Sequence, residues 1–201
     1  MARSLDPTGR STFDNMFAAF LLQHIRGYGC WCYFDDQVGL GRSHPTDSID
    51  EMCRILQYGY ECVAMDHENC VPQDTYYDPL PSFDNIESNC QSVNGGHGQC
   101  AVDACIVETT FVKNYFLEVG LTAASVDESK QHQNGFSVDT NCPTKQGSVS
   151  ERACCGSFPN RFPYRTLNDQ RKCCGSTTYD SEINQCCEEA GDYVIRFICG
   201  L

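Results

Sequence analysis

The sequence lacks the patterns that mark most metal-binding, nucleotide-binding and hydrolytic proteins. It has no Cys-x-x-Cys pair and only five histidines, so we do not expect a zinc site. It also contains no Gly-x-Ser-x-Gly motif, no phosphate-binding loop and no EF-hand pattern. These absences argue against a serine hydrolase, a nucleotide-binding protein and an EF-hand calcium sensor.

Long apolar runs and basic residues are also scarce. No stretch approaches the roughly 18 apolar residues of a membrane-spanning helix, so we expect no transmembrane segment. The run at 16–25 has no basic stretch close before it and no small-residue cleavage site after it, so we interpret it as part of a domain helix rather than a signal peptide. With 27 acidic against 14 basic side chains the formal net charge is −13, which argues against a nucleic-acid partner.

Cysteine is abundant instead. The 201 residues include 16 cysteines, an even number, and several stand in adjacent pairs. Such a density without zinc-binding spacings indicates disulfides, which persist outside the cytosol. We therefore predict an extracellular, secreted protein, and all the cysteines are candidate disulfide partners: Cys30, Cys32, Cys53, Cys62, Cys70, Cys90, Cys100, Cys105, Cys142, Cys154, Cys155, Cys173, Cys174, Cys186, Cys187 and Cys199.

The cysteines divide the chain into two parts. Eight fall between residues 30 and 105 and eight between 142 and 199, separated by the polar segment 122–141. Since each group is even, each could close its own bridges. We predict a helical domain at 1–121, a linker at 122–141 and a cysteine-rich module at 142–201.

Three segments of the first part have helical periodicity. Apolar residues recur at helical spacing in 13–24, 49–60 and 101–119, and Ser48 with Glu51 resembles a capping box at the start of the second segment. The stretch 70–98, rich in proline and glycine, is predicted to be a loop. The second part has too few apolar residues for a core, so its stability must come from bridges.

Two motifs in the first part resemble secreted phospholipase A2. Tyr28-Gly29-Cys30-Trp31-Cys32 is similar to the segment that opens that family's calcium loop. Pro45, Asp47, Asp50 and Cys53 follow in the order of its Pro-x-Asp-x-x-Asp pattern, and the third helical segment resembles its second long cysteine helix. The resemblance covers roughly residues 12–120 and implies a disulfide-rich α fold of phospholipase A2-like helices.

The catalytic residues that the resemblance implies are missing. The family uses a His-Asp pair, with His as general base and Asp as calcium ligand. One alignment places Leu56 and Gln57 there, and a shift by one residue places Gln57 and Tyr58 there. His67 begins a similar string, but about three turns too far along the helix. We therefore predict that the protein is not an enzyme.

The calcium loop departs from the family as well. Tyr33, Phe34, Asp35 and Asp36 replace the glycines whose carbonyls would wrap the ion. Asp35 and Asp36 are candidate ligands for calcium in another arrangement, and a solvated acidic turn is the alternative. No other cofactor is expected.

The second part resembles a galaxin-type repeat. Cys173-Cys174-Gly175, followed by Tyr179 and the pair Cys186-Cys187, fits the repeat, and the pair at 154–155 fits with a longer spacer. The resemblance implies an extracellular matrix component and a small, turn-rich disulfide module at the C-terminus.

These observations predict a non-catalytic structural protein that self-associates into an extracellular fibre or matrix, with Phe158, Phe162 and Tyr164 as interface candidates. The alternatives are a secreted binding module on the same scaffold and a calcium-dependent phospholipase A2 that uses His67. From the even split and the family's bridging of its helices, we expect disulfides to stay within each part. Cys32–Cys53 and a bridge from Cys62 or Cys70 to the third helix are expected in the first.

Overall fold

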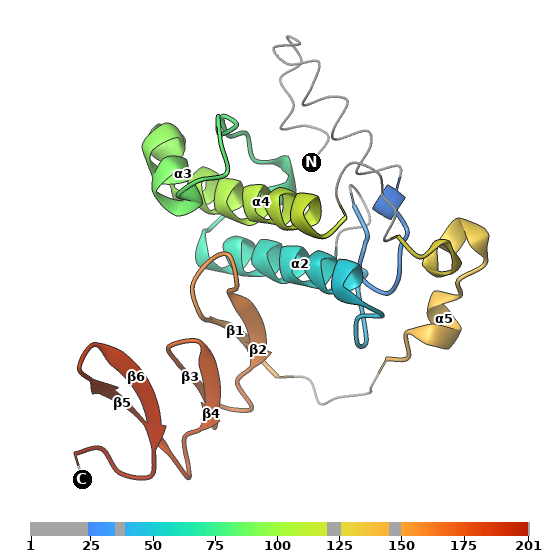
Figure 1. Cartoon of the computed structure of the whole chain (residues 1–201). Helices are drawn as coiled ribbons and strands as arrows, with labels where there is room; N and C mark the ends of the chain where they lie inside the picture. Colours follow the sequence, from blue (N-terminus) through green and yellow to red (C-terminus); the bar gives the residue numbers. More distant parts are fainter. Residues whose placement is uncertain (1–23, 35–38, 120–125, 145–149, 201) are drawn as a thin grey trace.

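Two long helices lie side by side at the centre of the helical part (Figure 1). The computed structural model describes residues 24–34, 39–119, 126–144 and 150–200. Helix α2 spans Ser48–Asp66 and helix α4 spans Gln99–Glu118. They run antiparallel, because Ser48 at the start of α2 bonds Glu118 at the end of α4, and His67 just beyond α2 bonds Asp103 near the start of α4. The second and third predicted helices are confirmed, whereas the first lies almost wholly outside the described residues.

The start of α2 follows from its sequence, with one correction. The N-cap is Asp47, whose carboxylate accepts from the Asp50 amide at 2.9 Å, and not Ser48 as the capping-box pattern suggested. Apolar residues then recur every three or four positions and are buried: Ile49, Cys53, Leu56, Tyr60 and Val63. This stripe faces α4 and forms the main core.

Helix α3, Ile86–Asn94, corrects the prediction of a continuous loop between the long helices. It packs against α4, and Cys90–Cys105 joins the two helices. Contact with both α2 and α3 explains why α4 is buried over most of its circumference rather than along one stripe. The segment between α2 and α3 otherwise contains the single 3₁₀ turn η2, Pro72–Asp74, and η3, Gly95–His97, follows α3.

The described part of the predicted linker is packed against the segment that precedes α2. It forms η4, Glu128–Lys130, η5, His132–Asn134, and α5, Val138–Asn141. The Gly29 amide donates to the Lys130 carbonyl at 3.0 Å, and the His132 amide donates to the Gly27 carbonyl at 2.8 Å. The segment therefore lies against the helical part. The domain boundaries themselves stay a prediction.

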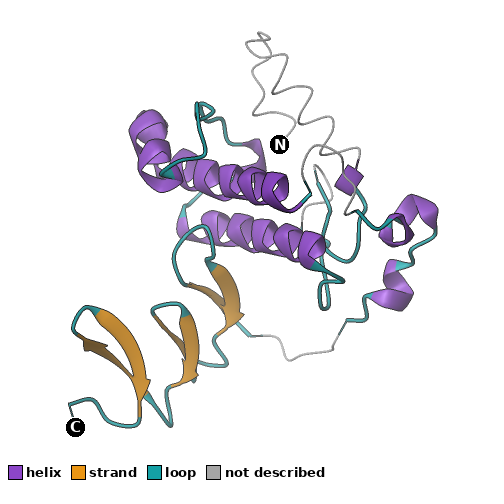
Figure 2. Cartoon of the chain, viewed as in Figure 1, coloured by secondary structure: helices purple, strands orange, loops and turns teal. Residues whose placement is uncertain are grey.

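Residues 150–200 of the C-terminal part form three antiparallel hairpins (Figure 2). The first pairs β1, Arg152–Cys155, with β2, Phe162–Arg165; the second pairs β3, Arg171–Cys174, with β4, Thr177–Asp180; the third pairs β5, Gln185–Glu189, with β6, Asp192–Arg196. The first hairpin packs on α2, and the others follow in a row that leads away from the helices. The turn-rich disulfide module is thus a row of hairpins.

The bridges connect the two parts of the chain, which corrects the expectation that they stay separate. Cys30 pairs with Cys142, and Cys62 on α2 pairs with Cys154 on β1. The even split of cysteines was compatible with these pairings, because a count cannot show which partners the fold brings together. Cys32–Cys53 is confirmed, as is a bridge from Cys70 to the third helix, at Cys100.

Each vicinal pair joins two neighbouring units. Four bridges run in sequence from α2 to the last hairpin: Cys62–Cys154, Cys155–Cys173, Cys174–Cys186 and Cys187–Cys199. One cysteine of each pair reaches back and the other reaches forward. We call this series the disulfide relay. It ties the hairpins together although each sheet has only two strands, which alone would be marginal in water.

Candidate functional site

The Pro-x-Asp-x-x-Asp motif holds three segments together at the start of α2. Asp47 caps the helix and pairs with Lys130 at 2.6 Å, and it also accepts from the Tyr28 hydroxyl. Burial acts to raise the pKa of Asp47, but the hydrogen bonds from the Asp50 amide, Lys130 and Tyr28 outweigh it and leave that pKa below its usual range. The motif therefore has a structural role at this position.

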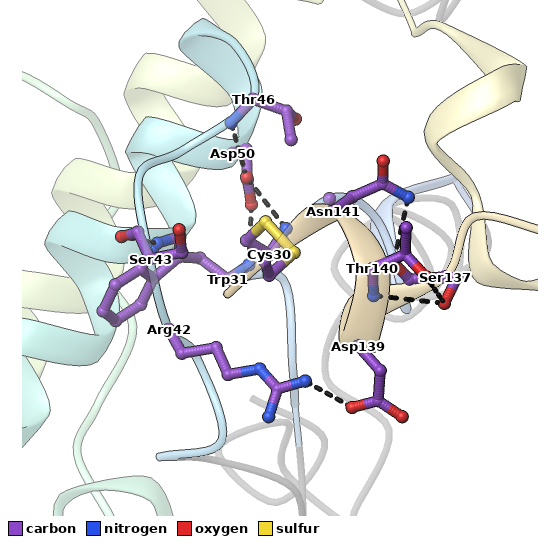
Figure 3. The surroundings of a disulfide bond; sticks show 12 residues. Cys30, Trp31, Arg42, Ser43, Thr46, Asp50, Ser137, Asp139, Thr140 and Asn141 are labelled. Carbon is purple, nitrogen blue, oxygen red and sulfur yellow. Dashed lines mark hydrogen bonds and ion pairs between the residues drawn. A yellow bond between two sulfur atoms is a disulfide. The ribbon is translucent and has the colours of Figure 1, made fainter. Parts of the chain in front are cut away.

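Asp50 anchors the turn that contains Cys30 and Trp31 (Figure 3). Its fully buried carboxylate accepts from the backbone amides of Cys30 at 2.9 Å, Trp31 at 2.7 Å and Thr46 at 2.8 Å. Burial raises the pKa of Asp50 above its ordinary value, and the three amide donors oppose the rise. Because its oxygens accept hydrogen bonds from backbone amides, this carboxylate has a structural role.

The positions where the resemblance implies a catalytic pair hold packing and bridging groups. Leu56 is 1% exposed and lies in the main core. The Gln57 amide donates to the Tyr33 carbonyl at 2.6 Å and accepts from the Gly39 amide at 2.6 Å. Tyr58 is half-buried and contacts the Trp31 ring edge-on, with ring centroids 5.3 Å apart. None of the three can act as a general base near pH 7.

From α2, the Gln57 side chain also joins the two ends of the loop that the resemblance assigned to calcium. Its side-chain amide donates to the Tyr33 carbonyl at the start of that loop and accepts from the Gly39 N–H at its end. Tyr33 and Phe34 are 8% and 4% exposed, and the Phe34 ring lies 6.1 Å from that of Phe111. The beginning of the loop is thus built into the core. The candidate ligands Asp35 and Asp36 lie outside the described residues.

A buried carboxylate that the sequence analysis missed lies between the long helices. Glu108 is 2% exposed, and its two oxygens accept from the hydroxyls of Tyr60 and Tyr77, each at 2.6 Å. A buried carboxylate of this kind could orient a catalytic base. The nearby position at which the resemblance implies that base, one turn before Tyr60 on α2, is Leu56, which cannot accept a proton. The available signal was an acidic residue within the largely apolar run 101–112. The arrangement ties α2, the segment after η2 and α4 together.

His67 is paired, but it lies far from the degenerate catalytic positions. Its Nε2 atom is 2.7 Å from the Asp103 carboxylate, whose other oxygen accepts from Gln99 at 2.9 Å. Eleven residues separate His67 from Leu56, a rise of about 16 Å along a helix. His67 therefore cannot replace the missing base at that position.

A half-open hollow lies beside α2 on the same side as Gln57. Its volume is about 440 Å³, and its wall includes the aromatic side chains of Trp31, Tyr58 and Tyr60, together with Glu61 and Arg152. The hollow combines aromatic surface with one carboxylate and one guanidinium. Of the three degenerate catalytic positions, Gln57 and Tyr58 border it and Leu56 does not. It contains no nucleophile–base pair among its lining residues.

Two of the three interface candidates from the sequence, Phe158 and Phe162, lie against the helical part of their own chain. Phe158 packs on both core clusters, with the Arg161 guanidinium 5.9 Å from its ring centre. Phe162 lines a shallow hollow with residues of α2, and Tyr164 is half-buried on β2. Their contact with a second copy stays a prediction.

Neither a metal cluster nor a membrane span emerges from the described residues. Within 24–34, 39–119, 126–144 and 150–200, no three His, Cys, Asp or Glu side chains come together as a metal site. No helix in the same ranges is long and apolar enough to cross a bilayer.

Comparison with known proteins gave no relatives. A scan against protein-family models, a search of curated proteins and a search of solved structures each found no match.

Proposed function

We propose that this chain is a non-catalytic structural subunit of an extracellular assembly, on a scaffold that resembles a phospholipase A2 followed by galaxin-type repeats. The observation that carries the proposal is the disulfide relay, which continues the covalent cross-linking of α2 through every hairpin to Cys199. Bridges restrict the unfolded chain and hold a shape that little core supports. All 16 cysteines form disulfides, eight of them in the relay, and this fits an oxidising environment.

The degenerate site supports the non-catalytic part of the proposal. Hydrolysis through a calcium-polarised ester requires a base and a charged metal ligand. Leu56 and Gln57 instead fill the core and connect Tyr33 to Gly39. Purified protein should therefore release no fatty acid from micelles with calcium present. Calcium-dependent release that disappears in a His67→Ala variant would contradict this part of the proposal.

The assembly part is tested by the state of the native protein. The charge of −13 opposes self-association at low ionic strength, so we expect assembly to strengthen when salt or divalent ions screen the repulsion. Sedimentation velocity and negative-stain images over a range of protein concentration should show growing oligomers or filaments. A monomer under every condition would overturn the structural role.

A soluble binding protein on the same scaffold is the second candidate. The aromatic hollow beside α2, with Trp31, Tyr58 and Arg152 in its wall, favours it. A monomer at high concentration that binds a small molecule there, with loss of binding on Trp31→Ala, would select this function instead.

A further inference from the structure

The hollow beside α2 has an aromatic wall that is held in place from behind. The Trp31 indole donates its Nε1–H to the Ser43 carbonyl at 3.2 Å, and a β-carbon on Gly41 would overlap the indole ring. The Tyr58 ring meets that of Trp31 edge-on, and both residues line the hollow. Small-molecule sites are largely formed in advance in this way and enclose about 300–1,000 Å³. The volume of about 440 Å³ lies within that range.

Polar groups with unused hydrogen-bonding capacity border the same hollow. Within the part of the chain that the structure describes, no hydrogen bond engages the Tyr58 hydroxyl or the Gln73 side-chain amide, and both side chains line the wall. The Arg165 guanidinium likewise has no hydrogen-bond or ion-pair partner among the described residues. A hydroxyl, an amide and a guanidinium are therefore left for an outside ligand.

The strand register places Arg165 next to the hollow. Arg165 lies directly opposite Arg152 in the ladder of β1 and β2, so the two side chains share one face of the hairpin. Pro163, two residues before Arg165, is on that face, and Pro163 and Arg152 both line the hollow. Like charges in directly opposite positions repel each other. Glu61 pairs with Arg152 alone, which leaves Arg165 with a positive charge that an anion would balance.

The lining favours a sugar over an acyl chain. A fatty acid needs a continuous apolar channel, whereas Gln57, Glu61 and Gln73 interrupt the aromatic surface here. Hydrocarbon laid over these groups would cut them off from water without giving them partners. A sugar ring has C–H groups for the aromatic wall and hydroxyls for the amide and carboxylate groups. A carboxylate on the ring would form a charge-assisted pair with a guanidinium.

The charge of the whole chain limits how many negative charges the ligand carries. At a formal net charge of −13, the protein repels a polysulfated chain over most of its surface. A ring with a single carboxylate gains the contact with Arg165 at the least repulsion.

We propose that the hollow binds a sugar acid, a sugar ring that bears one carboxylate, as in a uronic acid. The carboxylate pairs with Arg165, and the ring hydroxyls bond the Tyr58 hydroxyl and the Gln73 amide. The ring itself lies against the aromatic wall. This gives a ligand class to the hollow of the second candidate function, and it does not rest on the proposed assembly.

The single tryptophan of the chain makes the binding measurable. Since Trp31 lies in the wall, its fluorescence should change saturably when the full chain is titrated with glucuronic or galacturonic acid. Glucose and galactose lack the carboxylate, and acetate lacks the ring, so each should bind at least about tenfold more weakly by calorimetry. Equal affinity for an acid and its neutral parent sugar, or tighter binding of decanoate, would overturn the proposal.

Variants place the ligand in the hollow. Arg165→Gln should weaken glucuronic acid binding at least about tenfold, and Tyr58→Phe about threefold. Because Arg165→Gln also removes a like charge opposite Arg152, it should not lower the free energy of unfolding. The control Lys172→Gln, on the next hairpin, removes the same charge and should leave binding unchanged. Equal losses in Arg165→Gln and Lys172→Gln, or unchanged binding in Arg165→Gln, would overturn the site.

The outcomes separate this site from the structural role. Protein that assembles but binds neither uronic acid would overturn the sugar-acid site and leave the structural role standing. Protein that stays monomeric and binds glucuronic acid through Arg165 would support the site and select the binding function in place of the structural one.

Discussion

Asp50 shows how a single carboxylate can be committed to the backbone. It satisfies three amides in a region that is closed to solvent, and Gly29 is required beside it. A β-carbon on Gly29 would lie 2.4 Å from the Asp50 carboxyl carbon, and the φ of +58° at Gly29 is one that side chains disfavour. The turn with Cys30 and Cys32 thus depends on this pair of residues.

We expect Asp50→Asn to destabilise the protein by about 3 kcal/mol, because the new amide group turns a donor toward backbone donors in a buried site. The free energy of unfolding from guanidinium titration measures the loss. The exposed Asp84→Asn change should stay within about 0.5 kcal/mol. Equal stability of the two variants would show that the three hydrogen bonds do not hold the turn.

Two buried tyrosines predict loss of stability in alkali. Burial raises the pKa of Tyr115 to about 12, and burial with the hydrogen bond to Asp47 raises the pKa of Tyr28 further. The unfolded chain ionises its tyrosines near pH 10, so it releases protons that the folded chain keeps, and the free energy of unfolding must fall as pH rises above about 10.

Denaturation midpoints between pH 9 and 12 measure this fall. Tyr115→Phe should reduce the fall, and the exposed Tyr193→Phe should leave it unchanged. A Tyr115→Phe variant with the wild-type slope would contradict the assigned burial effect.

At the scale of elements, the bridge between α2 and β1 determines whether the hairpins are held on the helices. Removing it with Cys62→Ala and Cys154→Ala should accelerate amide exchange in β1 and β2 by about 10²-fold, because local opening is no longer restricted. Helix α4 should keep its protection. The matched change at the far end, Cys187→Ala with Cys199→Ala, should loosen β5 and β6 alone. Amide exchange in β1 at the same rate in the two double variants would contradict the relay.

The sequence predicts the long helices better than their connections. The apolar spacing of Ile49, Cys53 and Leu56 is a local property, and α2 contains it. Helix α3 was missed because it is nine residues long and is flanked by prolines and glycines. Its stability comes from Cys90–Cys105 and from contact with α4, neither of which periodicity reports.

The candidate site was predicted only in part, because the sequence pattern reports local positions and not long-range contacts. Alignment of the motif placed Leu56 and Gln57 where the resembled family has its catalytic His-Asp pair. In the structure Leu56 packs in the core and the Gln57 side chain bonds to the Tyr33 carbonyl. The Glu108 cluster and the His67–Asp103 pair depend on residues that are 31 to 48 positions apart. The antiparallel packing of α2 on α4 brings Tyr60 to Glu108 and His67 to Asp103, and the segment after η2 adds Tyr77.

In the whole molecule, a continuous series of disulfides joins the helices to the last hairpin. Cys62–Cys154 joins a helical part that has a core to the first hairpin, and three further bridges continue through hairpins that have almost no core of their own. The same continuity would carry load from one end of the chain to the other in the proposed assembly.

Disulfide mapping of the native, non-reduced protein tests this most directly. Since the vicinal cysteines stay on one peptide after proteolysis, stepwise partial reduction and alkylation followed by fragmentation in the mass spectrometer must separate the two members of each pair. We expect Cys62–Cys154, Cys155–Cys173, Cys174–Cys186 and Cys187–Cys199, with Cys30–Cys142 as a second link between the parts. Bridges between adjacent cysteines, or bridges of residues 142–199 confined to that range, would contradict this pairing.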